Sequence, residues 1–233
     1  LRSRQNNAGG FGLWNASPDT ATYATLYAAQ FLLEAKDRQH PIPEDLLNNT
    51  LKFVKSYANR QHSSLAELRQ AAWAIYLLAR NGEVMSRELI NLQADLNKYF
   101  PKQWQQDLTA AYIASSLALH QQQDLGLPLM QNLGWQEKER RQVVYQDNLT
   151  ELAIHLYLQT KHFPELTPKL PEEVLYTASR AISTQNYHSH SAAWLILGLE
   201  SYHQQATQSS FATELSYTQS ASKDAIQLAP AAN

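Results

Sequence analysis

Four carboxylates occupy positions at which a glycan-cleaving enzyme could hold its paired acids. Asp19, Asp107, Asp147 and Glu151 each fall just before, or within the first turn of, an apolar segment. Two carboxyl groups placed across a bound sugar supply the general acid and the base or nucleophile of glycoside hydrolysis. The same positions suit helix N-caps, because an acid there accepts backbone N–H bonds and faces the positive end of the helix dipole. The capping role is favoured, and no catalytic residue is assigned.

Histidines give weaker indications of chemistry. His188 and His190 are the one close pair in the sequence, but a zinc site needs further ligands and the chain has no cysteine. His155 lies inside an apolar segment, which favours a hydrogen-bonded core histidine over a general base. His62 falls in a polar link and is expected at the surface. We therefore predict no metal ligand, no cofactor-binding residue and no cofactor.

Composition narrows the classes of function. The 233 residues carry 19 Lys and Arg against 21 Asp and Glu, a formal charge of −2, so no nucleic-acid partner is expected. Without cysteine the chain can form no disulfide, no thiolate zinc site and no thioester. No uninterrupted apolar run reaches the roughly 20 residues of a membrane-spanning helix, so no membrane contact is expected. These features indicate a soluble piece of a longer polypeptide.

The acids and histidines are expected to lie on helices or between them, because one apolar segment recurs along the chain. Each of five copies combines small residues, an anchor position and a continuation rich in leucine. The anchor positions are Tyr23, Trp73, Tyr112, Ala153 and Trp194, separated by 50, 39, 41 and 41 residues. A period near 40 is typical of two helices and two turns per unit. Only 7 glycines in 233 residues agree with helices joined by short links.

Between the recurrent segments lie amphipathic ones, which bury a single stripe at helical spacing. One stripe comprises Leu47, Leu51, Val54 and Ala58, and another comprises Leu89, Leu92, Leu96 and Tyr99. The recurrent segments are apolar nearly all round and must be buried on several sides. The pattern therefore predicts an inner and an outer layer of helices.

Local signals mark several helix ends. Ser64 to Glu67 and Asn148 to Glu151 match the capping-box pattern, and Asn81-Gly82 ends a helix that begins near Leu65. Gly126-Leu127-Pro128 predicts a short or broken outer helix.

Hairpins of this period either stack as an open solenoid or close into an α/α toroid. Small residues beside single bulky anchors let inner helices crowd around an axis, and the units differ more than those of binding arrays usually do. We expect an all-α fold, an α/α toroid of helical hairpins over residues 1–205. An open helical-repeat scaffold that binds peptides stays as an alternative. Residues 206–233 are expected to form a polar tail or the start of a following β domain.

Aromatic residues of the recurrent segments are expected in the core. Trp104 and Trp135 fall in loop-like segments and are expected on an exposed patch instead.

The most distinctive stretch is Gly9-Gly10-Phe11-Gly12-Leu13-Trp14. Its glycines allow positive φ and close backbone approach, while Phe11 and Trp14 can plug apolar surface at the end of the toroid. A phosphate loop would need a lysine or a glycine pattern between a strand and a helix, and neither is present. We therefore assign the turn a structural role.

This turn, with Thr22-Tyr23 and Phe31-Leu32 in the helix that follows, resembles the thioester-domain region of bacterial alpha-2-macroglobulins. These proteins are relatives of complement proteins. The resemblance covers residues 3 to about 203 and is strongest over the first 45. It implies an α/α toroid like that of terpenoid cyclases and complement thioester domains, with one or more hairpins upstream of residue 1.

The resemblance also implies a function. The chain would be a non-catalytic domain of a broad-spectrum protease inhibitor, a periplasmic protease trap that shields the cell envelope. Its partners would be other domains of the same long polypeptide and, after bait cleavage, the target proteases. The family's Cys-x-Glu-Gln thioester motif is absent from these residues, so no thioester residue is assigned. A carbohydrate-active toroid enzyme, a glycosidase or lyase, is the alternative from the acids.

Overall fold

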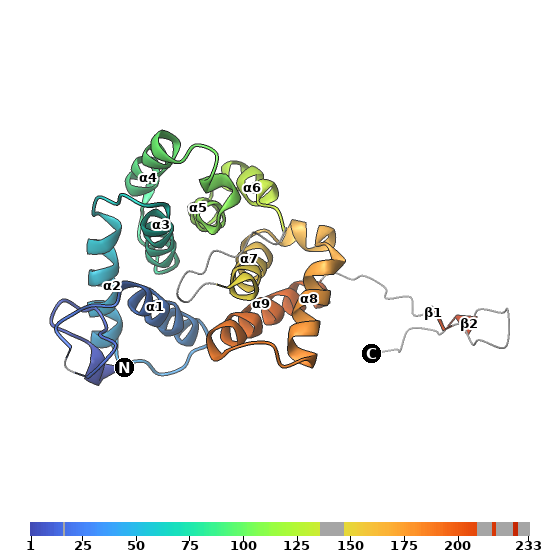
Figure 1. Ribbon diagram of the computed structural model, residues 1–233, viewed down its shortest axis with the longest axis horizontal. Coiled ribbons are helices and arrows are strands. Elements are labelled where there is room, and N and C mark those ends of the chain that lie inside the picture. The colour runs from blue at the N-terminus through green and yellow to red at the C-terminus, as the bar shows by residue number, and fades with distance from the viewer. Residues whose placement is uncertain (16, 136–146, 209–215, 218–225, 228–233) are drawn as a thin grey trace.

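The computed structural model describes residues 1–15, 17–135, 147–208, 216–217 and 226–227, and these are mostly helical (Figure 1). Within them the α-helices are α1 (Thr22–Asp37), α2 (Glu44–Ala58), α3 (Leu65–Arg80), α4 (Ser86–Tyr99), α5 (Leu108–Leu119), α6 (Gln123–Asn132), α7 (Asn148–His162), α8 (Glu172–Ser183) and α9 (Ser189–Gln208). Short 3₁₀ helices span Arg2–Arg4, Trp104–Gln106 and Pro164–Lys169. The two-residue strands β1 (Ser216–Tyr217) and β2 (Ile226–Gln227) pair antiparallel.

The odd-numbered helices form an inner ring and the even-numbered helices lie outside it (Figure 1). Ring neighbours pack against one another in the order α1, α3, α5, α7 and α9. The ring closes because His190 of α9 lies 3.0 Å from the Tyr23 hydroxyl of α1, and Arg38 pairs with Glu200 at 2.5 Å. The described helices thus form the predicted α/α toroid rather than an open solenoid.

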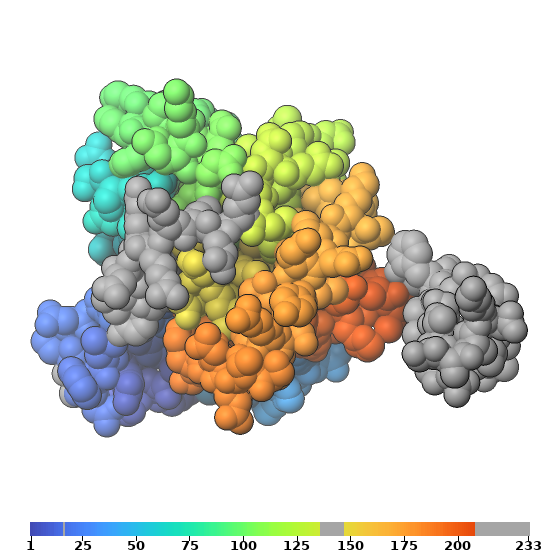
Figure 2. Space-filling model, turned by 45° about the vertical axis from the view of Figure 1, so that its right-hand side comes forward, coloured from blue at the N-terminus to red at the C-terminus, as the bar shows by residue number. Residues whose placement is uncertain are grey.

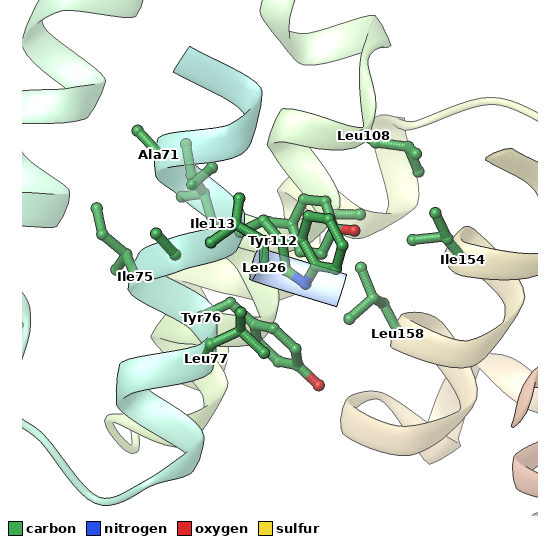
Figure 3. Packing of buried hydrophobic residues seen from close by; sticks show 14 of the residues in the cluster. Leu26, Ala71, Ile75, Tyr76, Leu77, Leu108, Tyr112, Ile113, Ile154 and Leu158 are labelled. Carbon is green, nitrogen blue, oxygen red and sulfur yellow. The ribbon is translucent and has the colours of Figure 1, made fainter. Parts of the chain in front are cut away.

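The inner helices are buried on most sides because they are apolar nearly all round. In α5 every residue from Leu108 to Leu117 is buried. The Trp73 ring lies 5.8 Å from Tyr112 and 5.9 Å from Trp194, so predicted anchors meet at the centre. Figure 3 shows this core, to which the inner helices contribute Leu26, Tyr76, Ile113 and Leu158.

Each outer helix buries one stripe, as predicted. The buried members are Leu47, Leu51 and Val54 in α2 and Leu89, Leu92 and Leu96 in α4. Tyr99 was predicted to lie on this stripe, and that prediction is wrong. Tyr99 is the last residue of α4 and is 56% exposed, with the Lys98 ammonium 4.7 Å from the centre of its ring. In the space-filling view, the region of α4 and α6 forms the upper surface (Figure 2).

Several predicted helix ends are confirmed. Ser64 and Glu67 form the capping box of α3, and Gly82 follows that helix with φ of 90°. The short helix predicted around Pro128 is α6, which contains this proline.

The predicted capping box at Asn148 is wrong. Asp147 is the N-cap of α7, and its carboxylate accepts the Thr150 N–H at 2.7 Å. Asp147 is the N-cap because its short side chain reaches the first free N–H groups of the helix.

The C-terminal boundary is less sharp than predicted, since α9 continues to Gln208. The strand pair lies within residues 206–233, and the division of the chain near residue 205 stays a prediction. None of the described helices is long and apolar enough to span a membrane.

Candidate functional site

The Gly9–Trp14 motif lies in a tightly packed segment, residues 4–14, which we call the N-terminal clip. Gly9 has φ of 84°, and a Cβ there would lie 2.0 Å from the Asn49 carbonyl oxygen of α2. Gly10 and Gly12 are similarly enclosed, with side-chain carbons 2.4 and 2.6 Å from their Cβ positions. The glycines are therefore required mainly by close approach, and one of them also by its positive φ.

Phe11 joins the clip to two helices. Its side chain is buried, its N–H donates to the Thr25 hydroxyl at 2.9 Å, and its carbonyl accepts the Ala21 N–H at 2.9 Å. The Gln5 amide donates to the Leu46 carbonyl of α2 at 3.1 Å. The clip thus fixes the start of α1 against α2, and Phe11 takes part through its buried side chain and its backbone.

Leu13 and Trp14, at the end of the motif, are exposed to solvent. Their side chains are 49% and 75% exposed, so the prediction that Trp14 plugs the end of the toroid is wrong. Phe11 fills the apolar surface under the turn, and the following residues turn outward. The motif therefore presents Trp14 to solvent.

Acids at the N-terminal end of the ring, where the inner helices begin, do not form a catalytic pair. Arg69 lies between two of them, with Nε 2.7 Å from Asp107 and Nη1 3.4 Å from Glu151. Asp107 also accepts the Thr109 N–H at 2.9 Å and so caps α5. Burial opposes the charge of Arg69, but the carboxylates outweigh it and raise its pKa. Asp19 is exposed and makes neither of these contacts.

The space beside Arg69 is too small for a sugar. The cavity lined by Arg69, Tyr23, Trp73 and Tyr112 measures about 10 Å³, room for one water molecule at most. Small-molecule sites usually enclose about 300–1,000 Å³. The geometry therefore gives the glycosidase or lyase alternative no support.

His188 and His190 face different partners. His188 Nε2 is 2.9 Å from the Asp147 carboxylate, whereas His190 Nε2 is 3.0 Å from the Tyr23 hydroxyl and 3.3 Å from the Trp194 indole nitrogen. An indole N–H only donates, so His190 accepts at Nε2 and is neutral. Burial lowers the pKa of His190, and nearby His188 lowers it further. Among the described residues, no three His, Cys, Asp or Glu side chains are grouped to hold a metal ion.

The predicted aromatic patch is wrong. Trp104 is only 3% exposed, and the Trp135 ring stacks on His155 with centroids 3.8 Å apart. His155 is buried, as predicted for a core histidine. His62 is half-buried rather than on the surface, with Nε2 3.1 Å from the Tyr57 carbonyl oxygen.

A buried ionic cluster at the opposite, C-terminal end of the ring was not found from the sequence. The Glu34 carboxylate, 7% exposed, accepts hydrogen bonds from Arg80 at 2.7 Å, Arg38 at 2.6 Å and Gln30 at 2.9 Å, and from the Tyr157 hydroxyl. These donors come from three ring helices and the residue that follows α1. The cluster therefore ties α1, α3 and α7 together.

The electrostatics of the cluster favour a structural role. Burial opposes ionisation of Glu34, but Arg80 and Lys161 outweigh it and lower its pKa to about 2. A carboxylate that stays ionised and is surrounded by donors does not act as a general acid near neutral pH. The sequence does show a charged residue in the last turns of each of three apolar segments. No local pattern, however, indicates that these charged residues contact one another.

Comparison with known proteins finds relatives of one kind. The chain is 38% identical over 208 residues to an alpha-2-macroglobulin homologue of Yersinia pestis. It is 30% identical to the alpha-2-macroglobulins of Rickettsia conorii and Pasteurella multocida, and these matches cover 87% and 88% of the chain. The chain is homologous to part of the bacterial alpha-2-macroglobulins. No family model matches the sequence.

Solved alpha-2-macroglobulins share the fold. The native Escherichia coli protein has a TM-score of 0.67 and 16% identity, and its trypsin-activated form has 0.67 and 18%. Each comparison covers 97% of this chain, and at this identity the likeness shows the fold alone. The chain spans 10% or 11% of the length of the three curated relatives.

This homology confirms the resemblance inferred from the Gly9–Trp14 motif and the all-helical fold expected with it.

Proposed function

We propose that the chain is a non-catalytic helical domain of a bacterial alpha-2-macroglobulin, a protease trap that protects the cell envelope from the periplasm. The observation that carries the proposal is homology over 87% of the chain. The contacts of three of the acids agree with it, because Asp107 and Glu151 share Arg69 and Asp147 caps α7. Solved relatives include forms of the Escherichia coli protein activated by trypsin and by porcine elastase, which supports proteases as partners.

The domain would act through its position rather than through a covalent bond of its own. A thioester needs a cysteine thiol, and the 233 residues contain none. These residues therefore cannot acylate a captured protease. In the proposed trap, bait cleavage elsewhere in the polypeptide lets neighbouring domains move around the protease, and the toroid serves as one rigid body among them.

Where the ring closes between α1 and α9, two apolar side chains stay exposed. Phe31 of α1 and Ile196 of α9 are 58% and 66% exposed, although both lie on inner helices. Phe31 is one turn beyond Tyr27, whose ring contacts Trp194 of α9. Ile196 is one turn before Glu200, which pairs with Arg38 at the end of α1, so both exposed side chains border the junction of α1 and α9. We propose that an earlier hairpin of the parent polypeptide packs here. Residues expected upstream would thus cover the two exposed side chains.

The trap is tested by incubating the parent polypeptide with a slight molar deficit of trypsin. A protease that is enclosed but not inactivated keeps its activity on a small chromogenic peptide and loses its activity on a large protein substrate. That split is the expected result. Equal inhibition of both substrates, or of neither, would contradict the trap.

A further inference from the structure

Leu13 and Trp14 form an exposed apolar pair, which we call the clip tip. With Trp14 75% exposed and Leu13 49% exposed, the tip differs from the other exposed large side chains of the described residues. Those lie mostly singly on helices, as is normal for protein surfaces; examples are Ile90, Leu125 and Tyr176. Tryptophan supplies much of the binding energy where it enters a pocket on a partner.

The clip holds this tip in a fixed position. The Gly12 N–H donates to the Arg4 carbonyl at 3.0 Å, and the Arg4 guanidinium donates to the Leu13 carbonyl at 3.1 Å. Beneath it, Phe11 is buried against the α1 and α2 junction. A tip whose backbone is already ordered loses less conformational entropy when it binds than a flexible loop would.

Charge beside the tip indicates the chemistry of the partner. Arg2 is paired with Asp45 at 2.7 Å, whereas Arg4 makes no ion pair with a described residue. A cation next to an exposed tryptophan fits an apolar pocket with a carboxylate at its rim.

Further observations indicate which molecule supplies the pocket for the clip tip. The cavities found among the described residues of a second copy measure about 10 and 80 Å³, well below the roughly 300 Å³ of a typical binding pocket, so they leave no room for the tip. A broad-spectrum trap meets proteases of different shapes, so one preformed anchor suits a partner of constant structure better. Figure 1 shows the clip beside α1 and α2 at the outer edge of the toroid, where a neighbouring domain can reach it.

We propose that Leu13 and Trp14 dock into an apolar, carboxylate-rimmed pocket on another domain of the same polypeptide. The proposal rests on the proposed function, since it requires a longer parent protein. The N-terminal clip would then have two roles, fastening α1 to α2 with Phe11 and fastening the toroid to its neighbour with Trp14.

Hydroxyl-radical footprinting read by mass spectrometry tests the proposal. In the 233-residue chain, Trp14 should be oxidised rapidly, like exposed Tyr176, while buried Trp73 is protected. In the parent polypeptide, Trp14 should become as protected as Trp73. An Arg4→Glu variant of the parent should restore part of the Trp14 oxidation, whereas Arg87→Glu, a charge reversal on distant α4, should not.

Three results would overturn the proposal. They are rapid oxidation of Trp14 in the parent, protection that appears only when protease is added, and protection that grows with the concentration of the parent. The first shows no docking, the second a protease contact and the third self-association. Protection of Trp14 in a parent that traps no protease would contradict the proposed function and leave the docking proposal standing.

Discussion

The two ends of the inner ring hold buried charge in different ways. At the N-terminal end, Asp107 meets Arg69 and also accepts a backbone N–H of α5. At the C-terminal end, Glu34 depends on side-chain donors such as Arg80 and Arg38. Helix polarity explains the contrast, because the first turn of a helix offers free N–H groups and the last turn offers only carbonyls. A buried acid is therefore harder to satisfy at the C-terminal end, which should be the more sensitive of the two.

The largest effect is expected from Arg80→Met. This change keeps much of the side-chain volume but leaves Glu34 buried without its least exposed cation, since Arg80 is only 4% exposed. Losing one partner of a buried pair costs about 3–5 kcal/mol, and urea denaturation of the 233-residue chain measures the loss.

Two control variants identify the cause. Arg2→Ala breaks the ion pair with Asp45, in which both side chains are more than 60% exposed, and should cost at most about 1 kcal/mol. The double change Glu34→Gln with Arg80→Met should recover part of the loss, because it removes the buried charge that Arg80 no longer offsets. An Arg80→Met effect no larger than that of Arg2→Ala would show that the cluster does not hold the ring.

Acid should weaken the C-terminal end first. Burial lowers the pKa of His162 to about 3, with Lys161 and Arg80 adding to the effect. The folded chain thus keeps His162 neutral while the unfolded chain binds a proton below about pH 6.5, so stability falls as pH drops from 6.5 towards 3. At about 1.4 kcal/mol per pH unit, the loss reaches about 3 kcal/mol by pH 4.

Glu34 adds a second loss at lower pH. Its folded pKa of about 2 is below the ordinary value of 4.5 for a glutamate, so its stabilisation is present above pH 4.5 and is lost between pH 4.5 and 2. Urea denaturation at a series of pH values measures both phases. A His162→Gln variant should flatten the curve between pH 6.5 and 4.5, and an unchanged slope would refute the assignment to this histidine.

A smaller effect is expected from Asp107→Asn at the N-terminal end. The amide oxygen can still accept the Thr109 N–H, and Arg69 keeps Glu151 as a partner. Loss of the charged hydrogen bonds should cost about 1–2 kcal/mol by urea denaturation. A cost equal to that of Arg80→Met would erase the contrast between the two ends.

The smallest effect is expected from Glu200→Gln at the rim of the C-terminal end. Glu200 pairs with Arg38, and both side chains are more than a third exposed. The change should cost about 0.2–1 kcal/mol in the same assay. A larger loss would mean that the number of ion pairs, rather than their burial, sets the sensitivity of this end.

The layers of the fold could be predicted from sequence, whereas the polar contacts between them could not. Helical periodicity is local, so Leu47, Leu51 and Val54 reveal their buried face without knowledge of any partner. Arg80 and Glu34 are 46 residues apart, and Arg80 and Tyr157 are 77 apart. No local pattern joins such residues, because their contact exists only after the ring has closed.

In the clip, too, the sequence alone does not determine which side chains are buried, although the residues concerned are close together in the chain. Its glycines and Phe11 indicate a compact turn, but which of Phe11 and Trp14 is buried depends on the surface that α1 and α2 present to it. Trp104 was misplaced for a related reason, since a 3₁₀ turn that looks like a loop in the sequence packs into the core.

The closed ring is tested most directly by the distance between α1 and α9. The chain has no cysteine, so Phe31→Cys and Ile196→Cys give two specific sites for spin labels, both at exposed positions. Pulsed electron resonance on the doubly labelled chain should give one short, narrow distance distribution, because α9 returns to α1. A long or broad distribution would mean that the hairpins form an open array, and the toroid on which the functional proposal rests would be wrong.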